Sequence, residues 1–420
     1  MSTFPFRIAF DEALAIVERV AAQRRLPVER VTLSRAHGRI LAEDVVAGLA
    51  QPPFDNSAMD GFAFRHADLA GEGTTLHLAG EQFAGRALDL RLEPGQCVRI
   101  TTGAPLPQGA DTVVMKENVT LEQATVDGHR VHLDVVPRRG QHVRVAGEDT
   151  RAGDRVLHAG EPLTPARIAL AASQGLAELA VARRPTVAVF TTGDELVEPG
   201  LPLAPGQIYN SNREQLMGLL RADGLEPTAW PTLPDDPAQL ESALRHAGHA
   251  FDVVITCGAV SAGEKDHLPA LLQARGRMHF WKVAMKPGMP VLLADGDGEY
   301  APDNGRLGTA LFLCLPGNPV SVLANWLTLG RALIDGLQGR AAPRPRWRAR
   351  LTAPWSKTHE RLEFLRGRLH AHQDGSLHVE PNPADGSHRM RAAADSDALI
   401  VLAAGQREYP AGAVVDVLTY

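Results

Sequence analysis

Cysteine is scarce in this chain. The 420 residues include only Cys97, Cys257 and Cys314, with no CxxC pair. An odd number of widely spaced cysteines offers neither a disulfide framework nor the spacing of a zinc site. The pattern therefore predicts reduced thiols and a cytoplasmic protein.

Long hydrophobic runs and a strong charge of one sign are also missing. No apolar run approaches the roughly 20 residues that span a bilayer, and the first residues, MSTFPFR, hold no apolar signal-peptide core. The formal net charge of -6 argues against a dedicated binder of nucleic acid or of anionic membranes. We expect neither as a partner, although a local basic pocket for one small anion is compatible with this total.

Several common catalytic motifs are absent as well. The chain has no GxxxxGKS/T phosphate loop, no GxGxxG after a strand, no HExxH and no GxSxG. Its 16 histidines are scattered without ligand spacing. These absences disfavour nucleoside triphosphatases, dehydrogenases, zinc hydrolases and serine esterases.

Apolar runs and helical patterns alternate along residues 185–340. We expect strands near residues 186–191, 226–230, 252–257, 278–283, 290–294 and 311–315. Capping signals at Ser211, Asp236 and Asn318 predict helices between them. This rhythm predicts a central, doubly wound, mostly parallel α/β domain.

The flanking segments predict three further domains, so the expected fold class is multidomain α/β plus β. Residues 51–145 are short β runs with many glycines and prolines, which indicates an inserted small β domain. Residues 1–50 and 146–184 each hold a helical pattern, and we expect them to pack together as one discontinuous helical and β N-terminal domain. Residues 346–420 are again β runs and predict a C-terminal β-barrel, or a sandwich.

Glycine-flanked charged residues follow the expected strands. The segments TTGDE (191–195) and CGAVSAG (257–263) are turns in which small residues let a ligand approach the backbone, and Glu264, Lys265 and Asp266 follow the second. In an open α/β sheet, the loops at the carboxyl ends of the strands form the ligand crevice. Asp194 and Glu195 carry the carboxylate oxygens that Mg²⁺ prefers.

Basic residues and a helix start add to this set. Lys282 and Lys286, four residues apart in WKVAMKPGMP (281–290), would face one side of an extended segment and suit an oxyanion. LPGNP (315–319) is a strand-to-helix elbow. Each feature also has an ordinary structural interpretation, as a turn, a helix cap or a solvated lysine pair, so none establishes a function alone.

Taken together, these segments resemble the molybdopterin molybdenumtransferase family, which includes MoeA and the E domain of gephyrin. The matching segments, which follow the family's order, are PFDNSAMDG (53–61), TGAP (102–105), TGDEL (192–196), YNSN (209–212), DD (235–236), VS (260–261) with Asp266, residues 282–290, residues 315–321 and EFLR (363–366). Each segment is weak alone, but the ordered set is specific. The resemblance implies four subdomains and a homodimer.

The resemblance also implies a reaction and residue roles. Adenylylated molybdopterin and molybdate would be the substrates, Mg²⁺ the cofactor, and molybdenum cofactor and AMP the products. The implied catalytic residues are Asp60, Glu195, Asp266, Lys282 and Lys286, and the first three would hold Mg²⁺. Substrate contacts are implied for Thr102, Gly193, Asp194, Asn212, Asp236, Gly258, Ser261, Pro287, Pro316, Gly317, Asn318, Ser321 and Arg366. Asp60 and Thr102 lie outside the α/β domain and suit a site shared across a dimer interface.

The chain departs from the family pattern in a few places. Ala259 stands where the family has glycine, which costs energy if the backbone there needs a positive φ. Met289 replaces a residue that is often basic, and the C-terminal Gly-Ser-Gly-like turn reads GSHR (386–389). Two other functions therefore stay open: a molybdopterin-binding scaffold without turnover, and a related molybdopterin adenylyltransferase. Transient contacts with such an adenylyltransferase or with apo-molybdoenzymes are a further expectation.

Overall fold

The computed structural model describes residues 4–124, 128–261, 263, 266–297 and 305–420. They form two compact units. The main unit comprises residues up to 42, 159–164 and 178–420, and the inserted unit comprises residues 43–158 and 165–177. No helix in this described part is long and apolar enough to cross a bilayer.

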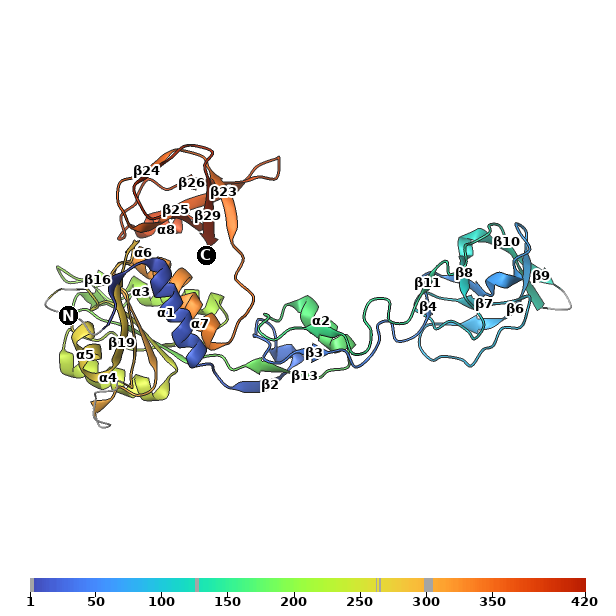
Figure 1. Ribbon diagram of the computed structural model, residues 1–420, viewed down its shortest axis with the longest axis horizontal. Helices are drawn as coiled ribbons and strands as arrows, with labels where there is room; N and C mark the ends of the chain where they lie inside the picture. Colours follow the sequence, from blue (N-terminus) through green and yellow to red (C-terminus); the bar gives the residue numbers. More distant parts are fainter. Residues whose placement is uncertain (1–3, 125–127, 262, 264–265, 298–304) are drawn as a thin grey trace. The chain divides into compact units, whose positions relative to one another are not determined.

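A seven-stranded sheet with the order β1-β19-β21-β22-β18-β14-β17 organises the main unit (Figure 1). Its strands are β1 (Phe6–Ile8), β14 (Val187–Thr191), β17 (Thr228–Ala229), β18 (Val253–Cys257), β19 (Arg277–Val283), β21 (Leu292–Asp295) and β22 (Leu311–Leu315). Strands β17, β14, β18 and β22 pair in parallel, as β1 does with β19. Parallel strands buried on both faces carry nearly continuous apolar runs, as β14 and β22 do.

Strand β21 runs antiparallel to both of its neighbours, β19 and β22. Only residues 284–291 separate β19 from β21. A parallel crossover needs a dozen or more residues, so a strand that returns this early pairs antiparallel. The sheet is therefore mixed, and it is parallel for most of its width, as predicted.

Helices cover both faces of this sheet. One face carries α1 (Phe10–Gln23), α3 (Ser211–Ala222) and a continuous helix made of α6 (Pro319–Asn325), the π-helical η5 (Trp326–Gly330) and α7 (Arg331–Leu337). The other face carries α4 (Pro237–Ala250) and α5 (Leu268–Arg275). Successive residues of β14 alternate between the two cores, with Val187 and Val189 in the first and Ala188 and Phe190 in the second. The predicted doubly wound α/β domain is confirmed.

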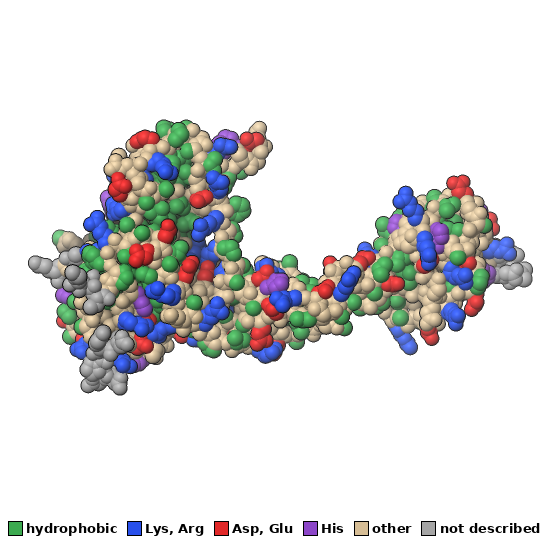
Figure 2. Space-filling view, in the orientation of Figure 1, with side chains coloured by type: hydrophobic (Ala, Val, Ile, Leu, Met, Phe, Trp, Pro, Cys, Tyr) green, Lys and Arg blue, Asp and Glu red, His purple; other side chains and the backbone are tan. Residues whose placement is uncertain are grey.

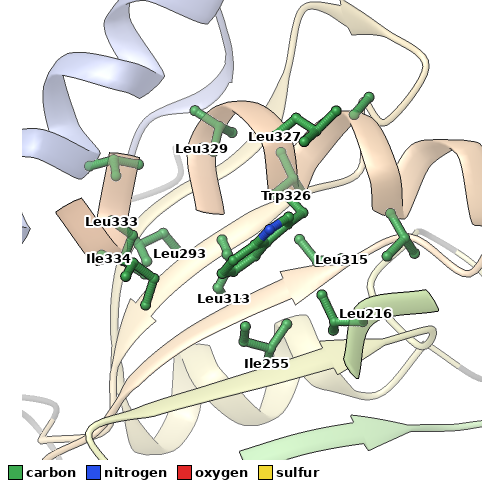
Figure 3. Packing of buried hydrophobic residues seen from close by; sticks show 14 of the residues in the cluster. Leu216, Ile255, Leu293, Leu313, Leu315, Trp326, Leu327, Leu329, Leu333 and Ile334 are labelled. Atoms are coloured by element: carbon green, nitrogen blue, oxygen red, sulfur yellow. The ribbon is translucent and has the colours of Figure 1, made fainter. Parts of the chain in front are cut away.

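Trp326 lies in the first core, and Figure 3 shows it among the leucines of β22 and of its own helix. Its side chain is fully buried, and its Nε1 donates a hydrogen bond to Asp223 Oδ2 at 2.9 Å. A Cβ at Gly330 would lie only 2.5 Å from the indole ring. The helix expected after the capping signal at Asn318 is present, and its turn from Trp326 to Gly330 is π-helical.

Helix α1 belongs to the core of the main sheet. The sequence analysis expected it to pack with residues 146–184. Instead its buried stripe (Ala13, Ile16, Val17, Val20 and Ala21) packs beside α7, where a Cβ at Gly336 would lie 2.6 Å from the Ala21 methyl. The physical reason is apolar area, because α2 (Pro165–Ser173) buries only Ile168 and Ala171. Strand β13 (Glu178–Ala182) does pair with β2 (Val28–Thr32).

The C-terminal strands close into a barrel, which decides between the two architectures predicted for this segment. Strands β25, β26, β23, β29 and β27 follow one another, and β27 pairs back onto β25. Their bounds are β23 (Trp347–Leu351), β25 (Leu362–Ala371), β26 (Leu377–Pro381), β27 (Ala398–Leu402) and β29 (Val414–Thr419), with β24 (Trp355–Lys357), β28 (Arg407–Tyr409) and helix α8 (Met390–Ala394) between them. Strand β20 (Met285–Lys286) pairs with β25 and so connects the α/β sheet to the barrel.

The inserted unit holds a six-stranded sheet with the order β8-β5-β7-β6-β10-β9. Its strands are β5 (Gly61–Phe64), β6 (Thr75–Gln82), β7 (Gln96–Ile100), β8 (Thr112–Met115), β9 (Val119–Ala124) and β10 (Gly128–Leu133). Two-stranded pairs flank it, namely β4 (Asn56–Ser57) with β11 (Val143–Arg144), and β3 (Val45–Val46) with β12 (Arg155–Leu157). Where residues 51–145 are described, they contain no α-helix, in agreement with the predicted β domain. The boundaries assigned to the four domains from sequence stay predictions.

Candidate functional site

A cavity of about 500 Å³ lies at the carboxyl ends of β14, β18 and β22. The loop after each strand contributes to its wall, and parallel strands bring these loops to one edge of the sheet. Among the residues predicted from sequence, those that line the cavity are Gly193, Glu195, Asn212, Gly258, Asp266, Gly317 and Asn318. The crevice expected from the order of the strands is therefore present.

Two glycines shape the floor of the cavity. Gly193 has a φ of 146°, and a Cβ there would lie 2.5 Å from Glu195 Oε2. Gly258 has a φ of 106°, and a Cβ there would lie 2.7 Å from the carbonyl oxygen of Thr192. Both positions therefore favour glycine through their backbone conformation, and at Gly258 the Thr192 carbonyl also excludes a side chain.

The wall of the cavity contains buried polar atoms with unused hydrogen-bonding capacity. Asn212 Nδ2 donates to the Gly317 carbonyl at 2.6 Å, but Asn212 Oδ1 has no partner among the described residues. The same holds for Thr192 Oγ1. Buried polar atoms in proteins are normally paired, so these two atoms beside the cavity are exceptions.

Three carboxylates line the cavity: Glu195, Asp235 and Asp266. Asp266 Oδ2 accepts a hydrogen bond from the Gly263 N–H at 2.7 Å, which orients that carboxylate. Within the described ranges, no three His, Cys, Asp or Glu side chains cluster closely enough to hold a metal ion by themselves. Mg²⁺ commonly binds through one or two carboxylates together with substrate phosphates, so Glu195 and Asp266 fit a site completed by substrate.

The neighbouring acids have different surroundings. Asp235 lines the cavity, whereas the carboxylate of Asp236 accepts from the Gln239 N–H at 2.8 Å and caps α4. Asp194 is exposed and accepts from the Asp235 N–H at 3.1 Å. Ser261 is an exposed residue beyond β18, and Ala262, Glu264 and Lys265 lie outside the described residues.

A second group of charged residues, the Lys286 cluster, consists of Lys286, His359, Glu363, Arg366 and Asp385. Lys286 Nζ lies 2.9 Å from Glu363 Oε1 and 2.9 Å from Asp385 Oδ2. Partial burial disfavours the charged ammonium, but the hydrogen bonds to Asp385 and Glu363 outweigh this and raise the pKa of Lys286. His359 Nε2 lies 3.4 Å from Glu363 Oε2, and burial lowers the pKa of this imidazole.

Arg366 on β25 is only 1% exposed. Its Nη2 donates to the Ala384 carbonyl, while its Nε has no partner in the described part of the chain. Burial lowers the pKa of this guanidinium, and the nearby Asp385 carboxylate acts in the opposite direction. The cluster thus holds a buried cation with a donor left over.

The barrel loop, residues 382–389, connects this cluster with the cavity. Asp385 contacts Lys286, the Ser387 carbonyl accepts from the Val320 N–H at 3.2 Å, and His388 lines the cavity together with Met390. The expected pterin-binding and anion-binding groups are therefore connected by one short segment.

The remaining predicted residues of the main unit lie elsewhere around these two groups. Lys282 has a φ of 67°, and its Nζ lies 5.1 Å from the ring centre of Phe6 and 4.7 Å from that of Trp281. Pro287, Pro316 and Ser321 are buried, and Ser321 lies on α6. Among them, Lys282 offers a cationic side chain held by aromatic rings.

Asp60 and Thr102 belong to the inserted unit and contact each other. Asp60 Oδ1 accepts from the backbone N–H of Thr102 at 2.8 Å and from its hydroxyl at 3.0 Å. These hydrogen bonds lower the pKa of Asp60, and Lys116 at 3.9 Å adds to the effect. The carboxylate is therefore ionised and oriented, as a metal contact requires.

Sequence reasoning did not place Asp235, Asp385, His388 or Met390 in the site. Asp235 belongs to the DD segment, of which only Asp236 was selected, and His388 belongs to the GSHR turn noted as a departure. Asp385 gave no sequence signal, because its contact with Lys286 spans 99 positions along the chain.

Comparison with known proteins shows three family matches. The MoeA N-terminal region (domain I and II) matches residues 8–175, a probable molybdopterin binding domain matches residues 188–335, and the MoeA C-terminal region (domain IV) matches residues 348–420. Together these models cover most of the chain.

Relatives match over nearly their whole length. A molybdopterin molybdenumtransferase of Haemophilus influenzae is 40% identical over 391 residues, covering 93% of both chains. Molybdopterin molybdenumtransferase 2 of Mycobacterium tuberculosis is 39% identical and covers 95% of this chain and 97% of the relative. The crystal structure of a molybdopterin biosynthesis MoeA protein from Pyrococcus horikoshii has a TM-score of 0.80 at 25% identity, covering 99% of this chain and 100% of that chain. The chain therefore belongs to the molybdopterin molybdenumtransferase (MoeA) family, as the sequence resemblance predicted, and its role lies in molybdenum cofactor biosynthesis.

Proposed function

We propose that this protein inserts molybdenum into molybdopterin, using adenylylated molybdopterin, molybdate and Mg²⁺, and that it releases AMP. The observation that carries this proposal is the cavity at the sheet edge, which Glu195 and Asp266 line together with Asn212 and Asn318. A pterin phosphate needs hydrogen-bonding partners and a pyrophosphate needs a cation, and this wall offers the ligands for both.

The proposed roles follow from charge and position. Glu195 and Asp266 would hold Mg²⁺, which when bound neutralises the negative charge that develops on a pyrophosphate as its bond breaks. Lys286 and Arg366 would bind molybdate, because both carry positive charge beside the barrel loop. Lys282 would contact an anionic group of the pterin.

The roles of Asp60 and Thr102, and the homodimer, are proposed from the family resemblance. The ionised, oriented carboxylate of Asp60 suits a metal contact. Sedimentation velocity of the purified protein tests the dimer, and a monomer at micromolar concentration would contradict it.

The decisive assay combines purified protein with adenylylated molybdopterin, Mg²⁺ and molybdate. We expect AMP release that depends on molybdate, together with activation of a molybdoenzyme that lacks its cofactor. Tight binding of the adenylylated pterin without AMP release, under conditions in which a known insertase turns over, would instead indicate a scaffold. The family match over the first 175 residues favours the insertase over a molybdopterin adenylyltransferase.

Asp266→Asn tests the carboxylate that the Gly263 N–H orients. An amide retains the shape but removes the negative charge, so we expect AMP release to fall by roughly a hundredfold or more. The melting temperature should stay unchanged. Asp297→Asn is the matched control, since Asp297 is 37% exposed, pairs with Arg24 and is not among the residues lining the cavity. Full turnover by Asp266→Asn would remove this residue from the mechanism.

A further inference from the structure

The geometry of the Lys286 cluster points to an anion competitor that is part of the chain itself. We propose that the Asp385 carboxylate occupies the position on Lys286 that the substrate oxyanion takes, and that Asp385 thereby sets the affinity for that substrate. The identity of the oxyanion as molybdate rests on the proposed function.

The two carboxylates that contact Lys286 differ in how easily they can move away from it. Both lie 2.9 Å from Nζ, but the Glu363 side chain is 4% exposed and the Asp385 side chain is 49% exposed. Moving a buried carboxylate away from its cation leaves an uncompensated charge, whereas an exposed carboxylate becomes hydrated by water. Glu363 is therefore the permanent partner of Lys286, and Asp385 is the exchangeable one.

The charges in the cluster explain why a further anion requires such an exchange. Lys286 and Arg366 carry two positive charges, and Glu363 and Asp385 carry two negative charges, while the nearby Lys357 ammonium donates to the carbonyls of His359 and Gly405. The burial-lowered pKa of His359 leaves this imidazole neutral near pH 7. An oxyanion added to this balanced group would meet no net positive charge, while one that replaces Asp385 meets a group with a spare positive charge.

Arg366 offers the incoming oxyanion a hydrogen-bond donor that Asp385 does not use. Its Nε is buried without a partner, and its Nη2 already donates to the Ala384 carbonyl, one residue before Asp385. A tetrahedral oxyanion has more acceptor oxygens than a carboxylate and can accept from both cations. Buried donors gain most from such a charged hydrogen bond.

The barrel loop gives this exchange a consequence for the cavity. Asp385 lies three residues before His388, and the Ser387 carbonyl between them accepts from Val320. When the oxyanion displaces Asp385, the constraint on one end of the loop is lost while its other end lines the cavity. Binding of the anion and the shape of the cavity wall are thus linked through the barrel loop.

The test is direct binding of sodium molybdate to the full chain by isothermal titration calorimetry. Because the pair of Lys286 with a half-exposed carboxylate is modest in strength, we expect Asp385→Asn to bind molybdate roughly fivefold more tightly than the parent. Asp395→Asn is the matched control, as it makes the same charge change on the barrel at a residue paired with Arg391, and its affinity should be unchanged. In turnover, Asp385→Asn should lower the KM for molybdate.

Three results would overturn the inference. Unchanged or weaker binding by Asp385→Asn would make Asp385 an ordinary structural partner of Lys286. A gain that persists after Lys286→Met is added to Asp385→Asn would show that it does not act through Lys286. Absence of molybdate binding in the parent and in every variant would show that the cluster is not an oxyanion site, while AMP release in the separate turnover assay decides the proposed function.

Discussion

At the scale of single residues, backbone conformation marks the positions around the site where the chain is under constraint. Apart from glycines, Ala259 and Lys282 have positive φ values, of 52° and 67°. Side chains rarely adopt this left-handed region, and such residues gather at binding and catalytic sites. Ala259 immediately follows Gly258 of the cavity wall, so the methyl group noted from the sequence does lie where a glycine would be relaxed.

Ala259→Gly should therefore stabilise the protein. The left-handed conformation destabilises alanine by about 1–2 kcal/mol, and Ala259→Gly removes this strain. The greater conformational entropy of glycine in the unfolded chain offsets about 0.5–1 kcal/mol of the resulting gain in stability. We expect a net increase of about 0.5–1 kcal/mol in the free energy of unfolding, measured by urea denaturation. Ala36→Gly is the control, because Ala36 has a φ of -86° and gains nothing from glycine. Equal effects in the two variants would contradict the strain at Ala259.

Residues of the site could be predicted from sequence where their placement is local. Gly193 and Gly258 follow directly after apolar runs, so the strand pattern alone brings their loops to one edge of the sheet. Glu363 and Asp385 contact Lys286 only because the barrel docks beside the turn after β19. No local pattern encodes such a long-range contact, which is why the sequence placed the lysine but not its partner Asp385.

At the scale of elements, the length of a helix determined whether it could be predicted from the sequence. The longer helices α3 and α4 begin at the capping signals predicted at Ser211 and Asp236, and α1 accounts for the helical pattern in residues 1–50. Neither α5 nor α8 was predicted from the sequence, since a helix of eight or five residues shows too little periodicity. These two short helices depend on packing against the sheet and the barrel. No local sequence pattern encodes that packing.

The π-helical turn makes the clearest prediction for an element. In Gly330→Ala, the new methyl group would lie 2.5 Å from the buried Trp326 ring, so either the helix or the indole must move. Overpacking of this kind costs about 1–3 kcal/mol, which we expect as a loss in the free energy of unfolding by urea. Gly218→Ala in α3 is the matched control, because a Cβ there meets nothing within 4 Å. Alanine at that helical position should stabilise by up to about 1 kcal/mol.

A stabilising effect of both substitutions would show that the core around Trp326 has room for a methyl group. The π-helical turn would then not be a consequence of tight packing. A loss at Gly330 with a gain at Gly218 separates packing from helix propensity, since both variants make the same chemical change within a helix.

At the scale of the whole molecule, charge is dispersed and the buried ion pairs are local. On the face shown in Figure 2, acidic and basic side chains are interspersed over the described residues. Asp295 is an exception to this surface distribution, as it is fully buried on β21. It lies 3.0 Å from His279 Nε2 and 3.3 Å from Arg24 Nη2, and it also pairs with Arg277. It therefore connects the end of α1 to strands that follow more than 250 positions later in the chain.

This connection makes global stability depend on pH in a defined direction. Burial raises the pKa of Asp295. The hydrogen bond and attraction to His279 act in the opposite direction, as do the pairs with Arg277 and Arg24. Together they outweigh burial and lower the pKa below the ordinary 3.8. Since the folded pKa lies below the unfolded one, the stabilisation is fully present above about pH 4 and is lost as the pH falls through the folded value. Asp295→Asn should cost about 3 kcal/mol at pH 7, and this difference from the parent should shrink below pH 4.

Urea denaturation at pH 7 and near pH 3 measures this difference, with Asp297→Asn as the control. Asp297 also pairs with Arg24, at 2.8 Å, but it is 37% exposed, so its loss should cost less than about 1 kcal/mol at either pH. A cost for Asp295→Asn that stays constant down to pH 3 would mean that the loss of a hydrogen-bond acceptor, not the loss of charge, matters at this position. In that case α1 would be held to the sheet by its apolar stripe alone, and the buried carboxylate would contribute nothing through its ionisation.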